Sequence, residues 1–191
     1  MSIRLLSGLL ALLLVSERGV QTTTVVPLTF SELARAADTI ARVRVVDVSS
    51  SWRSQTSREQ VITTHVVFDV ERTLKGRAGS TLVLDFFGGR VGDVELSIDG
   101  TPRFIVGERC VLFVQDARAL SPIVGFMQGR FPITQSLDGT RTFVLTYDQR
   151  PFSATAQIGT AAPRASAAPV PAMSLDRFEQ AVVSEVASGG R

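Results

Sequence analysis

The clearest pattern of apolar and polar positions runs from residue 61 to residue 76, VITTHVVFDVERTLKG. Side chains of a β-strand alternate between its two faces. The even-numbered positions here are mostly apolar, from Ile62 to Leu74, and the odd-numbered positions carry most of the polar groups. A strand of roughly 13 residues would run about 43 Å, and strands of that length usually bend or serve two sheets. The pattern therefore predicts the long curved strand of a small β-barrel.

A strand and a short helix are predicted on the N-terminal side of this segment. Residues 39–49 alternate as a strand, but the apolar positions change from odd to even after Val45, which indicates a β-bulge. Residues 29–38 have the spacing of a short helix, for which Ser31 is the expected N-cap. Residues 49–60 read as a polar loop between the two long strands.

Further strands are predicted on the C-terminal side. Asp99-Gly100 and Asp138-Gly139 are strong hairpin signals, each between two apolar runs. Residues 109–115 are apolar on both faces, which is typical of a central strand that is covered on both sides. The expected strands occupy residues 81–87, 91–98, 102–106, 109–115, 130–135 and 140–147.

The composition changes after residue 150. Residues 151–173 are rich in Ala and Pro and read as a linker. Residues 174–187 read as an amphipathic helix with Phe178 and Val182 on its apolar face. Because a helix of this length is marginal by itself, this face should dock on the barrel, on a partner or on another copy. Phe178 and Val182 are therefore candidate partner contacts.

Together these elements predict a mainly β fold. We expect a small closed or partly open antiparallel barrel of OB-like type, with a short N-terminal helix and a C-terminal amphipathic helix. The barrel domain should span residues 27–150, before the linker and the final helix.

The N-terminal segment reads as a secretory signal peptide. Arg4 precedes an apolar run over residues 5–15, which is shorter than the roughly 20 residues of a membrane span. Residues 1–20 are therefore expected to direct the chain to the periplasm or the medium. The alternative is an amphipathic or buried N-terminal helix. We expect no stable membrane insertion unless residues 1–20 remain uncleaved.

Composition argues against several classes of function. Twenty basic and eighteen acidic residues give a net charge of +2, without the clustered basic residues of a nucleic-acid-binding face. Cys110 is the only cysteine and His65 the only histidine, which excludes an internal disulfide and a structural zinc site with four Cys or His ligands. We expect neither a cofactor nor a bound metal.

His65 and Cys110 are the two residues from which a catalytic site would have to be built. Asp69 lies on the same strand face as His65, but four residues along a strand correspond to about 13 Å, too far for a hydrogen bond. The sequence contains no G-x-S-x-G, H-E-x-x-H or P-loop motif. We therefore predict no catalytic residues, and a hydrolase is the least favoured alternative.

Short motifs in the barrel region carry a family resemblance. They are Ala37-Asp38-Thr39-Ile40 with Val45, Leu74-Lys75-Gly76, and Gly107-Glu108 before Val111-Leu112-Phe113. At these positions the chain distantly resembles the netrin and tissue-inhibitor-of-metalloproteinase-like group of OB-type barrels. In the order of its segments over residues 29–134, it resembles a set of uncharacterised exported bacterial proteins. The resemblance implies an exported barrel with a binding role. Those inhibitors use an N-terminal cysteine to bind zinc, and their barrels hold disulfides; this chain has no cysteine before Cys110, so neither feature carries over.

The function expected from the sequence is binding of a protein or peptide partner by an exported, non-enzymatic β-barrel. Trp52 and Arg53, in the polar loop, are further candidate contacts, although Trp52 could instead cover the barrel mouth or a sheet edge. The alternative is a small-molecule or lipid binder that uses the barrel lumen. An interior filled by large apolar side chains would argue against that alternative. The side chains expected there are Phe68, Phe86, Leu112 and Phe113.

Overall fold

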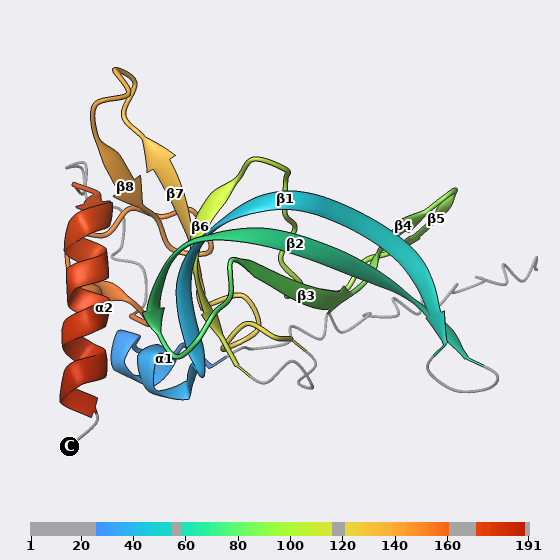
Figure 1. Ribbon diagram of the computed structural model, residues 1–191, viewed down its shortest axis with the longest axis horizontal. Helices are drawn as coiled ribbons and strands as arrows, with labels where there is room; N and C mark the ends of the chain where they lie inside the picture. Colours follow the sequence, from blue (N-terminus) through green and yellow to red (C-terminus); the bar gives the residue numbers. More distant parts are fainter. Residues whose placement is uncertain (1–25, 55–58, 116–120, 161–170, 190–191) are drawn as a thin grey trace, which may run out of the picture.

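The computed structural model describes residues 26–54, 59–115, 121–160 and 171–189. Its main feature is a seven-stranded sheet in the order β3-β2-β1-β6-β7-β8-β9, in which all neighbours are antiparallel (Figure 1). The strands of this sheet are β1 (Thr39–Ser54), β2 (Gln60–Lys75), β3 (Thr81–Phe87), β6 (Arg109–Val114), β7 (Arg130–Gln135), β8 (Thr142–Val144) and β9 (Met173–Ser174). The other elements are the β4 (Gly89–Val91) and β5 (Val94–Leu96) hairpin, helices α1 (Phe30–Ala36) and α2 (Leu175–Gly189), and a 3-10 turn at Thr155–Gln157. The prediction of a mainly β fold with two terminal helices is confirmed.

The long curved strand predicted from the sequence is β2, and its partner β1 has the same length of 16 residues. Their register shifts between Val45 and Asp47, which confirms the bulge expected where the apolar positions change parity. The predicted loop at residues 49–60 is wrong in its first half, because residues 49–54 continue β1. This serine-rich stretch is held in the strand by pairing with the β-branched start of β2; Trp52 lies opposite Ile62.

One of the two predicted hairpins is confirmed. Asp138-Gly139 lies in the turn between β7 and β8, with Gly139 at a φ of +70°. Asp99-Gly100 also forms a turn, but residues 102–106 do not form the expected strand after it. Phe104 instead packs its ring 5.1 Å from that of Phe68, measured between centroids. Burial of this ring holds the segment over the core rather than in a ladder, and the hairpin forms earlier, between β4 and β5.

The central strand β6 separates two hydrophobic cores. Val111 and Phe113 face the core under the helices, whereas Cys110, Leu112 and Val114 face the core inside the curve of β1, β2 and β3. Alternation along a strand gives this division directly. It confirms the prediction that residues 109–115 form a central strand covered on both sides.

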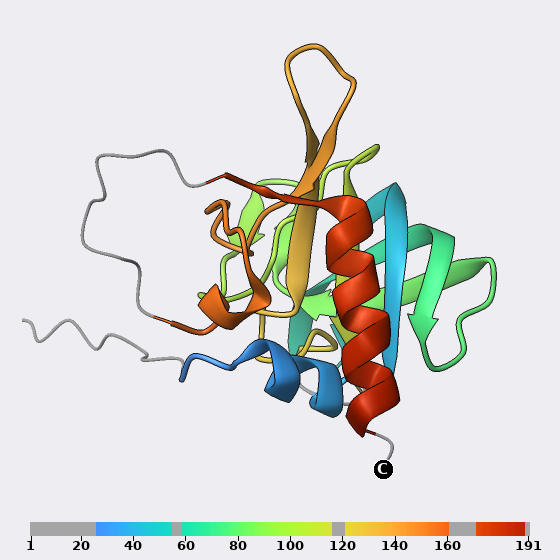
Figure 2. The ribbon, with the colours of Figure 1, turned by 90° about the vertical axis from the view of Figure 1, so that its left-hand side faces the viewer.

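Both helices cover the same end of the sheet (Figure 2). Helix α2 docks on its own chain through Phe178 and Val182, which have no exposed surface. The rings of this core lie in mutual contact, with that of Phe131 4.9 Å from Phe178 between centroids. Helix α1 has its N-cap two residues earlier than expected, at Thr29 instead of Ser31, and Thr29 forms a capping box with Glu32.

The ordered domain extends beyond the predicted boundary at residue 150. Phe152 and Ile158 are buried in the core under the helices, although both fall in the predicted linker. Residues 161–170 of that linker lie outside the described residues, as does the expected signal segment at residues 1–20.

The sheet does not close into a barrel. β3 and β9 form its two ends and do not pair with each other, because β6 pairs with β7 rather than returning to β3. Phe68, Phe86 and Leu112 fill the core inside the curve, and Phe113 fills the other. Within the described residues, no helix is both long enough and apolar enough to cross a membrane.

Candidate functional site

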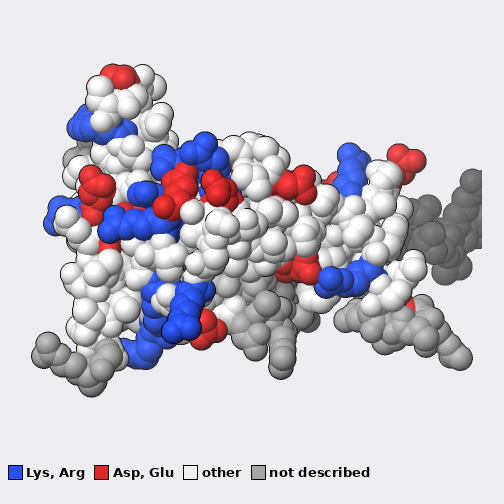
Figure 3. All heavy atoms as spheres, viewed as in Figure 1, with Lys and Arg blue, Asp and Glu red and all other residues white. Residues whose placement is uncertain are grey.

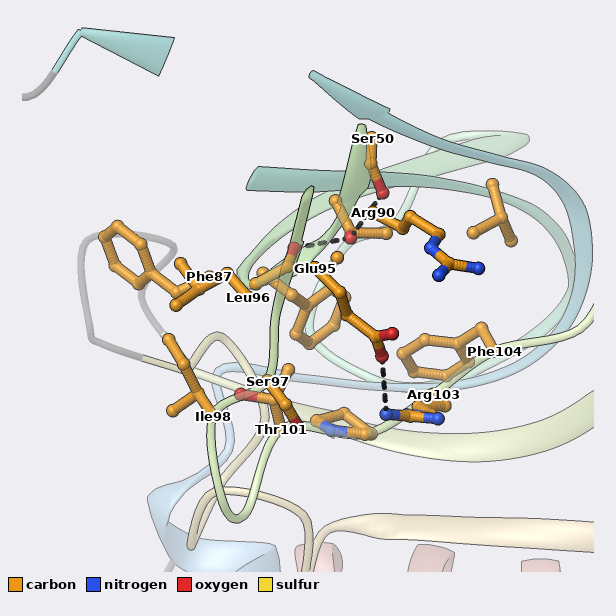
Figure 4. A pocket seen from close by; sticks show the side chains of 16 residues that line it. Ser50, Phe87, Arg90, Glu95, Leu96, Ser97, Ile98, Thr101, Arg103 and Phe104 are labelled. Atoms are coloured by element: carbon orange, nitrogen blue, oxygen red, sulfur yellow. Dashed lines mark hydrogen bonds and ion pairs between the residues drawn. The ribbon is translucent and has the colours of Figure 1, made fainter. Parts of the chain in front are cut away.

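A pocket lies at the end of the curved strands, away from the helices. It has a volume of about 280 Å³ and is enclosed by the concave face of β1 and β2, the β4–β5 hairpin and residues 96–104 (Figure 4). We call it the rim pocket. The side chains that give it chemical character are those of Arg90, Glu95, Ile98, Arg103 and Phe104.

Two glycines allow the chain to form this pocket. Gly88 and Gly89 have φ values of +97° and +131° as the chain leaves β3 and crosses over β2 and β1. A Cβ on Gly89 would lie 2.3 Å from Thr64 Oγ1 and 2.4 Å from Ser50 Oγ, so no other residue fits without displacing the crossing. The Thr64 hydroxyl donates to the Gly88 carbonyl over 2.6 Å. The glycine pair thereby holds the β4–β5 hairpin above the concave face.

The pocket combines an aromatic wall with an excess of positive charge. Arg90 and Glu95 lie opposite each other in the hairpin, and an Arg103 guanidinium nitrogen lies 3.3 Å from a Glu95 carboxylate oxygen. Figure 4 shows the Glu95 carboxylate turned toward Arg103. Two cations and one anion beside exposed apolar surface suit a ligand with an acidic group next to an apolar one.

The predicted contacts Trp52 and Arg53 point to opposite faces of β1. Trp52 lies two residues beyond Ser50 and therefore on the same face as the rim pocket; 45% of its surface is exposed. Arg53 lies on the convex face, where its guanidinium is 3.0 Å from the Asp85 carboxylate of β3. Of this pair, only Trp52 shares a face with the pocket.

The other two predicted contacts, Phe178 and Val182, are fully buried in the chain's own core and present no surface to a partner. Beside them, Glu179 is 2% exposed and accepts hydrogen bonds from Arg42 over 2.9 Å and from Arg72 over 2.7 Å. Both arginines belong to the curved strands. The apolar face of α2 is thus part of the fold, and Glu179 fastens the helix to β1 and β2.

A second carboxylate, Glu71, extends this ion cluster along the sheet. Arg109 donates two hydrogen bonds to its Oε2 and Arg44 donates to its Oε1, and Arg42 Nε lies 3.0 Å from Oε2 without being aligned for a hydrogen bond. The hydrogen bonds from Arg109 hold the pKa of Glu71 below its usual range, and Glu71 in turn raises the pKa of Arg109. Figure 3 shows basic and acidic side chains interspersed on this face of the molecule. The cluster joins β1, β2, β6 and α2.

His65 has a carboxylate partner that sequence reasoning missed. Its Nδ1 lies 2.7 Å from Asp85 Oδ1, on the exposed convex face of the sheet. The partner comes from β3, directly across the register from His65, and not from the strand of His65 itself. Ser49 lies opposite His65 on the other side, but its hydroxyl donates to Asp47 over 3.3 Å. This row orients an imidazole without a nucleophile bonded to it, whereas acyl transfer needs a nucleophile, a base and oxyanion donors that converge.

Cys110 lies in a different part of the fold from His65 and Asp85. Its side chain is fully buried in the core inside the curve, and burial raises the pKa of its thiol well above the usual range. A neutral thiol without solvent contact is a poor nucleophile. His65 points to the opposite face of the curved strands, so the two residues do not form a pair.

Across the parts of the chain that the structure describes, no three His, Cys, Asp or Glu side chains gather closely enough to hold a metal ion.

Known proteins supply no further guide to the site. Comparison with models of protein families, with curated proteins and with solved structures finds no match for this chain.

Proposed function

We propose that this chain is an exported, non-enzymatic β protein that binds a protein or peptide partner at the rim pocket. The observation that carries the proposal is the combination of Arg90 and Arg103 with the exposed apolar surface of Ile98, on the same concave face as Trp52. Interfaces are typically centred on aromatic and arginine side chains of this kind. Export rests on the signal segment expected at residues 1–20.

Binding is favoured over catalysis because the reactive side chains are placed unsuitably for a reaction. Cys110 is buried without a base, and His65 stands on an open convex surface beside Asp85. Neither lines the rim pocket. The residues that do line it offer shape, charge and apolar contact.

A small-molecule or lipid ligand is the second candidate function, and the observation that favours it is the pocket itself. At about 280 Å³, the pocket lies just under the range of about 300–1,000 Å³ that is typical of such sites. The lumen that was expected to hold such a ligand is occupied by Phe68, Phe86 and Leu112. A macromolecular partner is therefore the preferred ligand class.

We also propose that the sheet is a partly open variant of an OB-like barrel. The two long paired strands with a bulge, β1 and β2, support it. The open ends at β3 and β9 depart from it. We propose a relation to the netrin and tissue-inhibitor-of-metalloproteinase-like barrels on the same grounds, as the source of the binding role and not of its target.

Charge reversal in the rim pocket tests the proposed function. The full-length chain would be used to capture partners from the exported fraction, in parallel with the double variant R90E/R103E. The control R77E/R177E changes net charge equally at exposed arginines outside the pocket. We expect one partner to be retained by the wild type and the control and to be reduced at least about tenfold by R90E/R103E. Equal retention by all three chains would refute a role for the pocket.

A further inference from the structure

The free edge of β3 is the second feature of this end of the molecule. β3 is the last strand of the sheet, and among the described elements only β2 lies along it (Figure 1). The Gly88 amide donates to the Ile62 carbonyl and the Val70 amide to the Ser80 carbonyl, each over 2.8 Å. In an antiparallel pair, hydrogen-bonded and non-bonded residues alternate. Even-numbered residues of β3 therefore bond to β2, and the odd-numbered ones turn their backbone groups outward.

Four residues present backbone donors and acceptors along this edge. They are Thr81, Val83, Asp85 and Phe87, and no hydrogen bond from their amides or carbonyls to another part of the described chain is present. Successive outward residues are about 6.6 Å apart, the spacing at which a neighbouring strand offers its own groups. Such a row is a ready template for one more strand.

The edge also lacks the features that usually block strand addition. Natural edge strands are protected by lysine, proline, bulges or inward charges. The sequence of β3, TLVLDFF, has no lysine or proline, and its register with β2 contains no shift. Its single charge, Asp85, is engaged by His65 and Arg53. The opposite end of the sheet is protected differently, because β9 has two residues and leads directly into α2.

We propose that an extended segment of the partner adds to β3 as an eighth strand of the sheet, and that an acidic side chain of this segment enters the rim pocket. The inference rests on the proposed function and specifies how the partner is bound. Phe87 connects the two features, because it ends the β3 edge and also lines the pocket that contains Arg90 and Arg103. Backbone pairing supplies affinity in this mode, and the pocket supplies selectivity.

Charge complementarity favours a different protein over a second copy of this chain. An antiparallel copy would place its own Thr81 opposite Phe87 and bring the preceding turn, with the exposed Arg77, toward the pocket. Arg77 is a cation, as are Arg90 and Arg103. A segment with Asp or Glu where it passes Phe87 would instead be attracted. Val83, with 46% of its surface exposed, favours an apolar or β-branched residue beside it.

The test uses peptides selected on the full-length chain. A phage-displayed library of random dodecapeptides is selected on the wild type, and the most enriched sequence is synthesised with a fluorescein label. Its affinity is measured by anisotropy for the wild type, V83P and V83T. Proline at residue 83 removes an outward amide that β2 does not use, and proline is tolerated at such edge positions. Threonine keeps that amide.

We expect the enriched sequences to alternate β-branched residues and to carry Asp or Glu at one end. V83P should weaken peptide binding at least about tenfold, and V83T no more than about twofold. R90A/R103A should weaken the binding of peptides with Asp or Glu at that end more than the binding of peptides with Gln in the same place. Circular dichroism and the melting temperature establish that V83P is folded. If it is not, N-methylation of alternate peptide amides replaces it: methylation on the set facing β3 should abolish binding, and methylation on the other set should not.

Three outcomes would overturn the inference, and they separate it from the proposed function. Equal peptide binding by V83P and the wild type, with loss in R90A/R103A, would leave a pocket that binds without strand addition. A wild-type dimer that V83P converts to a monomer would show that a second copy occupies the edge. Failure to enrich any peptide would refute strand addition by a short segment, whereas the capture experiment would still decide the proposed function.

Discussion

The two ends of this sheet are built differently. At the helical end, both faces of the sheet are covered, five phenylalanine rings pack together, and Glu179 and Glu71 tie α2 to three strands. At the rim end, no other described segment covers the convex face of β1 to β3 or pairs with the outer edge of β3, and the charged groups are mostly exposed. The comparison indicates that stability is concentrated at one end and leaves the other end available for binding.

The division follows from β6, the strand that faces both cores. Every residue from Cys110 to Val114 is buried, so substitutions there affect the whole fold. Beyond β6, the curved pair β1 and β2 continues past the core, and its distal residues pair with each other over a surface that is largely open. We expect the rim end to fold only when the helical end is folded, whereas the helical end should stay folded when the rim end is disrupted.

The largest effect should come from Phe178→Ala. Removing this fully buried ring from the aromatic core should lower the free energy of unfolding by about 3–5 kcal/mol. Phe87→Ala, which removes a partly exposed ring at the end of β3, should cost less than half as much. Urea denaturation of both variants measures the difference, and equal losses would contradict the concentration of stability at the helical end.

Glu179→Gln should have a smaller but clear effect on stability. The substitution keeps the shape of the side chain and removes the charge that pairs with Arg42 and Arg72. A loss of about 1.5–3 kcal/mol is expected for hydrogen bonds to charged groups. Glu185→Gln, on the same helix and without an ion pair to any described residue, should stay within about 0.5 kcal/mol of the wild type. If the two variants unfold at the same urea concentration, the ion cluster does not anchor α2.

Acid should destabilise the chain partly through Glu71. Its pKa is lowered in the folded state from an ordinary value of 4.5, so the unfolded chain binds the proton more readily. The resulting stabilisation is complete above about pH 4.5 and is lost as the pH falls through the lower folded pKa. Melting temperatures between pH 7 and pH 3 should fall less steeply for Glu71→Gln than for the wild type. Parallel curves would show that Glu71 does not contribute to the acid sensitivity.

The smallest effect is expected from His65→Ala. The imidazole is 47% exposed and its pairing with Asp85 is a surface interaction. The free energy of unfolding should therefore change by no more than about 0.5 kcal/mol. Partner capture should also be unchanged, because His65 lies on the convex face. Loss of capture in a folded H65A variant would move the binding surface from the rim pocket to that face.

Sequence reasoning identified the features of this fold that are encoded locally. The alternation in β2, the change of parity at the bulge and the apolar residues of β6 each depend on neighbouring positions. Residues 49–54 were missed because their strand conformation comes from pairing with β2 and not from their own serine-rich sequence. The strand predicted for residues 102–106 is wrong because the ring of Phe104 packs against Phe68, a tertiary contact that the local sequence does not reveal.

The candidate site was less accessible to prediction for the same reason. The sequence marks Trp52 as a candidate contact, and its side chain is 45% exposed on β1, but the rim pocket depends on where Gly88 and Gly89 direct the hairpin. Asp85 was not recognised as the partner of His65 because only the β2–β3 register brings them together. Had the pairing of the second and third strands been aligned residue by residue, this pair could have been found.

The central claim is that the edge of β3 is free in the isolated chain and covered when a partner binds. Residue-specific amide hydrogen exchange, measured by NMR with and without the selected peptide, tests it most directly. The amides of Thr81, Val83, Asp85 and Phe87 should exchange rapidly in the free chain, between protected amides at Leu82, Leu84 and Phe86, and should become protected on binding. Protection of all seven amides in the free chain, or protection on binding confined to α2, would contradict the account.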